Sequence, residues 1–349
     1  MNINLELLRS NKPLIDLRSP NEFAKGAFPQ SINLPILTDD ERAKIGKSYK
    51  HQGSAAAVKL GHQLVSGDLK ESRLLAWKKF IEKSPSSWMY CFRGGQRSSI
   101  AKAWLKDIDI TISFVDGGFK ALRQTSLDIL ESVKNDNKRW IILGGRTGTG
   151  KTIILNQLAS SIDLENHAEH RGSAFGGLFS PQPTPIDFEN RLAIDYLRHG
   201  QKTLILEDES RTIGKVALPN AWFSRMQESE LVLLEISLEE RIQNIIEDYV
   251  LAPLRDGISR TDLLLSLRAS LLKIQKRLGG DLFREIRNKM DKAFLDPENF
   301  SHENWVNQLL HAYYDPLYDY QIKSKHDRCI FRSDTKGVTD YLSDLESSG

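Results

Sequence analysis

The stretch GGRTGTGKT, residues 144–152, limits the possible folds of this 349-residue chain more than any other feature. Gly145 is followed after four residues by Gly150, Lys151 and Thr152, which is the spacing of a phosphate-binding loop. The apolar stretch WIILGG favours a strand before the loop, and TIILNQLASSI favours a helix after it. This order predicts that the second half of the chain contains a P-loop NTPase-like α/β domain with a parallel sheet.

The residues of this loop indicate a ligand that carries two or three phosphates. Glycines let backbone amides turn toward phosphate oxygens, Lys151 supplies a positive charge, and the Thr152 hydroxyl can reach a magnesium ion. A P-loop does not specify which phosphate compound binds, and no guanine-specificity motif accompanies it. The predicted phosphate-binding residues are Gly145, Thr147, Gly148, Thr149, Gly150, Lys151 and Thr152.

Three acidic residues, Glu207, Asp208 and Glu209, follow the apolar stretch LIL, as a Walker B acid follows its strand. One of them is expected to position a metal ion or its water, and Asp208 is slightly favoured. The predicted magnesium ligands are therefore Thr152 and Asp208. In the alternative interpretation, Glu209 and Arg211 form a surface ion pair.

A second loop, in SWMYCFRGGQRSS (residues 87–99), surrounds one of the two cysteines with glycines and arginines. Cys91 is expected at the end of a strand, and Ser98 at the start of a helix. The positive charges and the helix N-terminus favour thiolate over thiol, so Cys91 is predicted to be a nucleophile. The alternative is that Cys91 is only a buried apolar residue. The predicted catalytic loop consists of Cys91, Arg93, Gly94, Gly95 and Arg97.

Cysteine-dependent phosphatases and rhodaneses both use a loop of this shape. The stretch LIDLRSPNEFAKGAFPQSINLP resembles the opening motif of rhodanese domains, and FVDGGFKAL resembles their closing Gly-Gly turn. Tyr90 also stands where the phosphatase signature has histidine. The first domain is therefore expected to be rhodanese-like.

These motifs and the alternation of strands with helices predict the domain organisation. We predict a rhodanese-like α/β domain over residues 1–132, a linker over 133–139, a P-loop α/β domain over 140–254, and a helical, basic extension over 255–349. Within the extension, a leucine and isoleucine stripe at helical spacing is expected to form core: Leu264, Leu267, Leu271, Ile274 and Leu278. Cys329, in the predicted strand DRCIFRS, is expected to be an inert packing residue.

The net charge of +2 is small, but residues 255–292 carry ten Lys or Arg against five Asp or Glu. A local basic surface of this kind is compatible with a polyanionic ligand. The sequence has no apolar run long enough to span a membrane and no secretory signal pattern, so a cytoplasmic protein without a membrane partner is expected. The oligomeric state is not indicated.

Four motifs together, YCFRGGQRS, GGRTGTGKT, HRGSAFGG (170–177) and LEDESRTIGKVALP (206–219), resemble the tRNA 2-selenouridine synthases. The resemblance implies a transferase that acts on the wobble uridine in the anticodon loop of tRNAs for Lys, Glu and Gln. A 2-thiouridine would first be alkylated on sulfur by geranyl diphosphate, and selenium from selenophosphate would then replace the S-geranyl group.

The resemblance also changes the expected role of the P-loop, which would hold the diphosphate of the prenyl donor. Cys91 matches the essential rhodanese cysteine of the family, and residues 145–152 match its phosphate loop. No covalent cofactor is implied, and magnesium is possible. Whether Cys91 carries selenium or attacks a tRNA-bound intermediate stays open at this point.

The basic helices are predicted to contact tRNA phosphates. Candidates for diphosphate or tRNA contact are Arg171, Ser173, Arg211, Arg268, Lys276 and Arg277, with Lys273, Arg284 and Arg287 in the same basic segment. Candidates to stack on the wobble base are Phe175, Phe179, Trp222 and Phe223.

Two other functions compete with this one. The first is an ATP-dependent sulfurtransferase, or a cysteine phosphatase, coupled to a P-loop ATPase. The second is a non-catalytic sensor in which Cys91 binds an oxyanion and the P-loop reports nucleotide. Neither explains the motifs at residues 170–177 and 206–219.

Overall fold

The computed structural model describes residues 2–347 and divides the chain into two compact units. Unit 1 comprises Met1–Ser132 together with Pro183–Arg198, and unit 2 comprises Val133–Gln182 together with His199–Gly349. Both units are α/β, as predicted. The domain boundaries differ from the prediction at residues 183–198, which the sequence placed in the P-loop domain.

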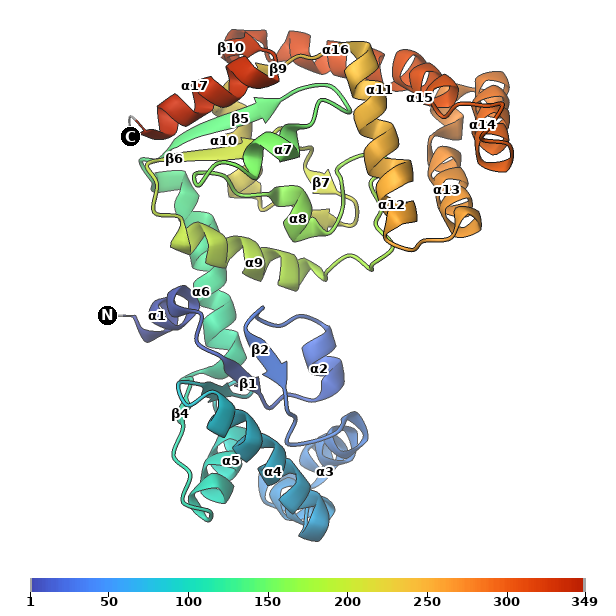
Figure 1. Cartoon of the computed structure of the whole chain (residues 1–349). Coiled ribbons are helices and arrows are strands. Elements are labelled where there is room, and N and C mark those ends of the chain that lie inside the picture. The colour runs from blue at the N-terminus through green and yellow to red at the C-terminus, as the bar shows by residue number, and fades with distance from the viewer. Residues whose placement is uncertain (1, 348–349) are drawn as a thin grey trace. The chain divides into compact units, whose positions relative to one another are not determined.

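Unit 1 is built on a four-stranded parallel sheet in the order β2-β1-β3-β4. Each strand has two or three residues, and most side chains of the central strands β1 and β3 are buried. Figure 1 shows helices α3 to α5 on one side of these strands and helices α1, α6 and α9 on the other. The strands are β1 (Leu14–Asp16), β2 (Ser31–Asn33), β3 (Trp88–Tyr90) and β4 (Ser113–Phe114).

Helices α4, α5 and α6 of unit 1 contribute buried side chains to its core. Trp77 of α4 is fully buried, stacks on Trp104 of α5 with ring centroids 6.0 Å apart, and donates Nε1–H to the Leu34 carbonyl at 2.9 Å. Gly53 interrupts α3 with a φ of 81°, which bends the helix in its middle. The helices are α1 (Ile3–Ser10), α2 (Pro20–Ala24), α3 (Asp39–Leu64), α4 (Gly67–Lys83), α5 (Gln96–Lys106), α6 (Gly118–Ser132) and α9 (Pro185–Arg198).

Helix α9 belongs to unit 1 because its polar residues satisfy backbone groups there. Asn190 is fully buried, donates to the Ala27 carbonyl at 2.8 Å and accepts a hydrogen bond of 2.9 Å from Arg123. Asp187 accepts from the backbone N–H of Ala27 at 2.7 Å. Ala27 lies 160 residues from Asp187 and Arg123 lies 67 residues from Asn190 along the chain, so no local pattern around α9 could have assigned it to this unit.

Unit 2 contains a second parallel sheet in the order β10-β9-β5-β6. The outer strand β10 comes from the end of the chain, where the sequence predicted a strand within an otherwise helical extension. Phe331 of β10 stacks on Tyr341 of α17 at 4.1 Å, which fixes the last helix on the sheet. The strands are β5 (Arg139–Gly144), β6 (Thr203–Glu207), β9 (Glu230–Leu234) and β10 (Cys329–Ser333), with a separate hairpin of β7 (Thr212–Ile213) and β8 (Val216–Ala217).

Helices α11 to α15 of unit 2 gather beside the sheet (Figure 1) and enclose a core of their own. The predicted stripe is part of it: four members are buried and Leu278 packs against them. The helix after the phosphate loop is shorter than predicted. The helices are α7 (Lys151–Leu155), α8 (Leu164–Ala168), α10 (Asn220–Glu228), α11 (Leu238–Ile246), α12 (Ala252–Arg255), α13 (Arg260–Leu278), α14 (Gly280–Leu295), α15 (Glu303–Leu309), α16 (Asp315–Ser324) and α17 (Thr335–Ser347).

Four further helical segments complete the described chain. Two of them, η2 (Glu247–Leu251) and η3 (Leu310–Tyr314), are π-helical turns at the ends of α11 and α15. The other two are the 3₁₀ turns η1 (Val133–Asn135) and η4 (His326–Arg328), of which η1 replaces part of the predicted linker. Among residues 2–347, no helix is long and apolar enough to cross a membrane.

Candidate functional site

The phosphate loop of unit 2 connects β5 to α7, as the sequence predicted. Gly148 and Gly150 have φ angles of 84° and 79°, which only glycine adopts without strain. A Cβ atom on Gly148 would also lie 2.7 Å from the Arg241 carbonyl oxygen. These glycines are therefore required for the loop geometry.

Helix α11 holds the loop from behind through two residues that the sequence analysis missed. Arg241, 3% exposed, donates from Nε to the Thr147 carbonyl at 2.9 Å and forms an ion pair of 2.5 Å with Asp315. Asn244 donates to the Gly148 carbonyl at 2.9 Å. Both contacts are made to backbone carbonyls, so neither of them occupies an amide of the loop.

Lys151 lies at the centre of this site and is close to several acids. Its Nζ donates to the Gly145 carbonyl at 3.2 Å. Burial alone would lower the pKa of Lys151, but the phenol of Tyr318 and the carboxylates of Glu207 and Glu165 outweigh it, so the pKa lies above its ordinary value. Lys151 is therefore a permanent cation in the loop.

Glu207, the last residue of β6, is the acid that contacts the phosphate loop. The Thr152 hydroxyl donates to its Oε1 at 2.7 Å. Asp208, favoured in the sequence analysis, instead accepts two hydrogen bonds of 2.6 Å from Lys325. The structure therefore brings Glu207, and not Asp208, next to Thr152, because Lys325, which lies between α16 and the turn that follows it, pairs with Asp208. The choice of Asp208 as a metal ligand stays a prediction.

Glu207 belongs to a cluster with Glu165 and Glu209, whose nearest carboxylate oxygens all lie within 4.8 Å of one another. Burial, and then the neighbouring carboxylates, raise the pKa of Glu165 to about 10 and that of Glu209 to about 7. Glu165, at the start of α8, carries no sequence signal and was missed. The alternative interpretation, an ion pair of Glu209 with Arg211, is not what the structure shows, because Arg211 donates to Asn220 at 2.7 Å.

These acids fit a magnesium ion. Mg²⁺ prefers hard oxygen donors, and a bound cation would stabilise three carboxylates that are otherwise crowded and partly protonated. Gly172 lies against the cluster, since a Cβ there would be 2.5 Å from Glu209 Oε1 and 2.6 Å from Glu165 Oε1. The HRGSAFGG motif thus covers the acids of the site.

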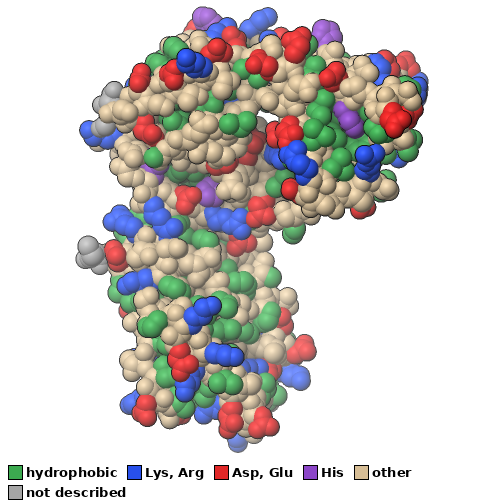
Figure 2. All heavy atoms as spheres, viewed as in Figure 1, with side chains coloured by type: hydrophobic (Ala, Val, Ile, Leu, Met, Phe, Trp, Pro, Cys, Tyr) green, Lys and Arg blue, Asp and Glu red, His purple; other side chains and the backbone are tan. Residues whose placement is uncertain are grey.

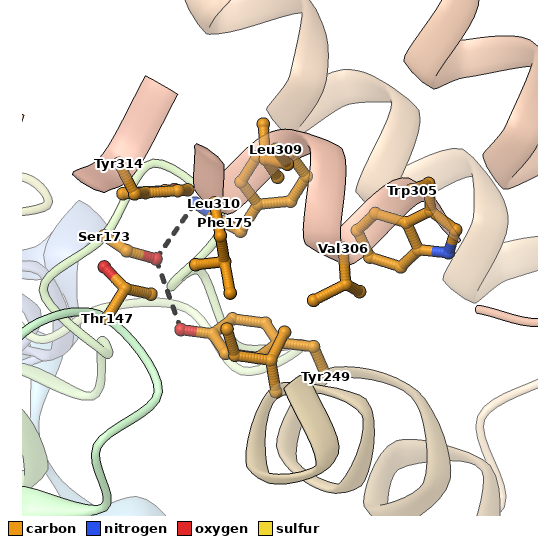
Figure 3. A pocket seen from close by; sticks show the side chains of 10 residues that line it. Thr147, Ser173, Phe175, Tyr249, Trp305, Val306, Leu309, Leu310 and Tyr314 are labelled. Atoms are coloured by element: carbon orange, nitrogen blue, oxygen red, sulfur yellow. Dashed lines mark hydrogen bonds between the residues drawn. The ribbon is translucent and has the colours of Figure 1, made fainter. Parts of the chain in front are cut away.

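The same motif forms one wall of a small apolar pocket next to the loop. Ser173 lies 3.2 Å from the hydroxyl of Tyr249 and accepts a hydrogen bond of 3.2 Å from the backbone of Phe175 (Figure 3). The cavity measures about 20 Å³ and is closed by the π-helical turns η2 and η3. It is lined by Thr147, Ser173, Phe175, Ile245, Tyr249, Trp305, Val306, Leu309, Leu310 and Tyr314.

Arg171 of this motif makes contacts within unit 2. It donates to the Asp248 carbonyl, and its guanidinium lies 5.1 Å from the centre of the Tyr249 ring. Arg171 therefore positions the turn η2 at the pocket wall.

In unit 1, Cys91 follows β3 and is 2% exposed. The closing Gly-Gly turn packs directly on the cysteine loop: the Phe119 amide donates to the Cys91 carbonyl at 2.8 Å, and a Cβ on Gly118 would collide with that carbonyl. Gly94, with φ at 66°, lies against the same turn. The sequence predicted that the helix begins at Ser98. Helix α5 instead begins two residues earlier, at Gln96, directly after Gly95.

The two arginines of the cysteine loop differ in their surroundings. Arg97 donates to Glu22 at 2.6 Å, and Arg42 contacts the same carboxylate at 3.0 Å. Burial would raise the pKa of Glu22, but the hydrogen bond and charge of Arg97 lower it below its ordinary value. Arg93 is exposed. Arg93 and Arg97 both line, with Cys91, a cavity of about 860 Å³, called the thiol cavity below.

Comparison with known proteins places these two loops in one family. The model of the tRNA 2-selenouridine synthase AAA domain matches residues 138–348. The chain belongs to the tRNA 2-selenouridine synthase family. A rhodanese-like domain model matches residues 4–125, in agreement with the predicted first domain.

Relatives named tRNA 2-selenouridine synthase match along almost the whole chain. The protein from Shewanella denitrificans is 46% identical over 348 residues, which cover 96% of this chain and 95% of the relative. The protein from Marinobacter nauticus is 44% identical over 355 residues, covering 97% and 95%. Among solved structures, the N-terminal domain of a putative ATP/GTP binding protein from Clostridium difficile matches 34% of this chain at 28% identity and a TM-score of 0.31.

In this member of the synthase family, some of the predicted tRNA-contacting cations have intramolecular partners. Arg268 joins α13 to α14 through a 2.7 Å bond to Asp291, and Arg277 donates to the Tyr313 hydroxyl at 3.3 Å. Lys276 is exposed. Figure 2 shows Lys and Arg side chains interspersed with Asp and Glu on the face that it displays.

The aromatic candidates for base stacking differ in exposure. Trp222 is fully buried against Trp140, with ring centroids 5.1 Å apart, and Phe175 is 7% exposed in the apolar pocket. Phe223 is half-buried, whereas Phe179 is 50% exposed. Trp222 and Phe175 cannot stack on a base without rearrangement, and Phe179 is the most exposed of the four.

Proposed function

We propose that this chain is a tRNA 2-selenouridine synthase that first prenylates a 2-thiouridine of tRNA and then replaces the S-prenyl group with selenium. The family membership supports tRNA as the substrate and a transferase as the enzyme class. The wobble uridine of tRNAs for Lys, Glu and Gln is the proposed target. Geranyl diphosphate and selenophosphate are the proposed co-substrates.

The observation that carries the choice of donor is the position of Thr147, which belongs to the phosphate loop and also lines the apolar pocket (Figure 3). A ligand with its diphosphate on the loop amides would direct its other end toward aromatic and aliphatic side chains. Since the pocket measures about 20 Å³, a ten-carbon chain enters only if side chains of η2 and η3 move apart.

In the first stage, the sulfur of 2-thiouridine attacks the C1 carbon of the prenyl chain, and the carbon–oxygen bond to diphosphate breaks. Lys151 and the loop amides stabilise the negative charge that develops on the departing diphosphate. Glu165, Glu207, Glu209 and Thr152 would hold Mg²⁺, which supplies further charge neutralisation when bound. The base loses its N3 proton to solvent in this step.

In the second stage, electron balance favours attack of Cys91 on the base. Selenium in selenophosphate is at the oxidation level of selenide, so a sulfur–selenium bond to Cys91 would require an oxidant. Attack of the Cys91 thiolate on C2 requires no oxidant. The bond between C2 and the sulfur that carries the geranyl group breaks, and geranyl thiol leaves after taking a proton. Selenium of selenophosphate then attacks C2 and expels the Cys91 thiolate. Water takes the phosphoryl group as phosphate, and N3 of the base regains a proton from solvent.

The test is mass spectrometry of nucleosides from thiolated tRNA-Lys after incubation with geranyl diphosphate, with and without selenophosphate. The wild-type protein is expected to yield S-geranyl- and then selenouridine. Lys151→Ala is expected to block the first product, and Cys91→Ala only the second. Unchanged nucleosides together with ATP consumption would support the ATP-dependent sulfurtransferase or phosphatase instead.

A further inference from the structure

The thiol cavity of unit 1 is much larger than a small oxyanion requires. Its volume of about 860 Å³ lies near the upper end of the range for drug-sized ligands. Cys91 lies at the end of β3 and contributes to its wall. A site that held only selenophosphate beside the thiol would need a small fraction of this space.

The lining of the thiol cavity combines hydrocarbon with positive charge. Five cationic side chains line it and no carboxylate does, among the residues that the structure describes. Apolar side chains from α3, α5 and the adjoining loops form most of the remaining wall. The apolar lining residues are Ile36, Leu37, Ala43, Ile45, Ala57, Val58, Val65, Phe92, Ile100 and Trp104, and the cations are Arg42, Lys47, Lys50, Arg93 and Arg97.

The bend in α3 creates this wall. Residues on both sides of Gly53 line the cavity, including Ile45 before it and Val58 after it. Of the 26 residues of α3, only Ala57 is fully buried. Ile45, Ala57 and Val58 of this long helix therefore line the cavity, while Leu64 at its end packs against the core of unit 1.

We infer that the thiol cavity binds the prenyl chain of the S-prenylated base, so that C2 of the base lies next to Cys91. This inference rests on the proposed function, and it assigns to unit 1 a binding site for a linear isoprenoid thioether. The hydrocarbon chain lies against α3 and α5. Lys47, Lys50 and Arg93, at exposed positions of the lining, face the phosphates of the attached RNA.

The first experiment supplies chemically S-alkylated RNA, which bypasses the prenylation stage. Selenation by wild-type protein is measured on a short RNA that carries S-geranyl- or S-methyl-2-thiouridine, with selenophosphate. Each buried methylene contributes roughly fourfold in affinity, so kcat/KM for the S-geranyl RNA is expected to be more than about 100-fold higher. Equal values for the two substrates would overturn the inference.

Variants that fill the cavity separate chain binding from chemistry. Val58→Trp and Ile100→Trp are expected to lower selenation of S-geranyl RNA by about tenfold or more, and to change that of S-methyl RNA by less than about threefold. Leu75→Trp, at a position on α4 that is 62% exposed and outside the cavity, is the matched control. An equal loss on both substrates, in variants that keep the wild-type melting temperature, would contradict the assignment.

Calorimetry on the wild-type protein gives a readout that needs no turnover or variant. S-Geranyl-2-thiouridine nucleoside is expected to bind about 100-fold more tightly than 2-thiouridine, with a negative heat-capacity change. Equal affinities would overturn the inference. If wild-type protein binds the S-geranyl nucleoside but does not selenate S-geranyl RNA, the proposed function fails while the binding site stands.

Discussion

The Thr152 hydroxyl donates a hydrogen bond of 2.7 Å to Oε1 of Glu207, which joins the end of the phosphate loop directly to the last residue of β6. The neighbouring Asp208 forms an ion pair with Lys325 instead. Two adjacent carboxylates therefore have separate partners: Glu207 contacts the phosphate loop, and Asp208 holds the segment after α16 through Lys325.

Substitution of Glu207 is expected to affect mainly activity, and substitution of Asp208 mainly stability. Glu207→Gln removes a proposed metal ligand and is expected to lower S-geranylation by about 100-fold. Asp208→Asn leaves Lys325 without its carboxylate, so the free energy of unfolding is expected to fall by about 2 kcal/mol. Initial rates of geranylation and urea unfolding of both variants test this. Loss of activity in Asp208→Asn alone would restore Asp208 as the metal ligand.

The acid cluster predicts how stability depends on pH. Burial, and then the neighbouring carboxylates, raise the pKa of Glu209 to about 7 and that of Glu165 to about 10. The unfolded chain ionises these groups near about pH 4.3, so above that pH the folded protein binds more protons than the unfolded chain. The melting temperature of the metal-free protein is therefore expected to fall between about pH 5 and pH 8.

Magnesium is expected to reverse this trend, because it binds the ionised carboxylates. Millimolar Mg²⁺ should raise the melting temperature more at about pH 8 than at about pH 5. Calorimetric scans with Mg²⁺ or with EDTA measure the effect, and Glu165→Gln is expected to flatten both the pH and the Mg²⁺ dependence. A stabilisation by Mg²⁺ that is the same at both pH values would argue against this cluster as the metal site.

Arg241 is expected to support the phosphate loop through its backbone. Arg241→Met leaves Asp315 without its buried partner and is expected to lower the free energy of unfolding by about 3 kcal/mol. Because Thr147 also loses the donor to its carbonyl, pyrophosphate is expected to bind about tenfold more weakly. Chemical denaturation and calorimetry test the two effects. Arg139→Met, which removes an exposed ion pair with Glu230, is the control and should alter neither by a measurable amount.

The Gly-Gly turn beneath Cys91 is expected to tolerate no side chain. Gly118→Ala places a methyl group against the Cys91 carbonyl at a φ of 58°, so selenation should fall by more than about tenfold and the free energy of unfolding by about 2 kcal/mol. Gly95→Ala is the control from the cysteine loop, because its φ is −90° and nothing lies within 4 Å of the added Cβ. Equal effects of both substitutions on selenation would show that the turn does not support the cysteine loop.

Much of the phosphate loop and of the cysteine loop could be predicted from the sequence. The spacing of Gly145, Gly150 and Lys151 identified the phosphate loop, and the residues around Cys91 identified the thiol loop. These predictions succeeded because each loop is encoded locally: positive φ angles require glycine at Gly148 and Gly94, and the adjoining strand and helix follow from neighbouring apolar residues.

Tertiary structure alone decided which distant residues complete each site. The sequence could not show that the carboxylate of Glu165 lies beside that of Glu207, or that Lys325 forms an ion pair with Asp208. Nor could it show that α9 packs in unit 1. It also could not show that the bent helix α3 lines a large cavity beside Cys91. Local chemistry fixes the backbone of a loop within a few residues, whereas the partner of a carboxylate or an apolar face depends on how segments far apart in the chain pack together.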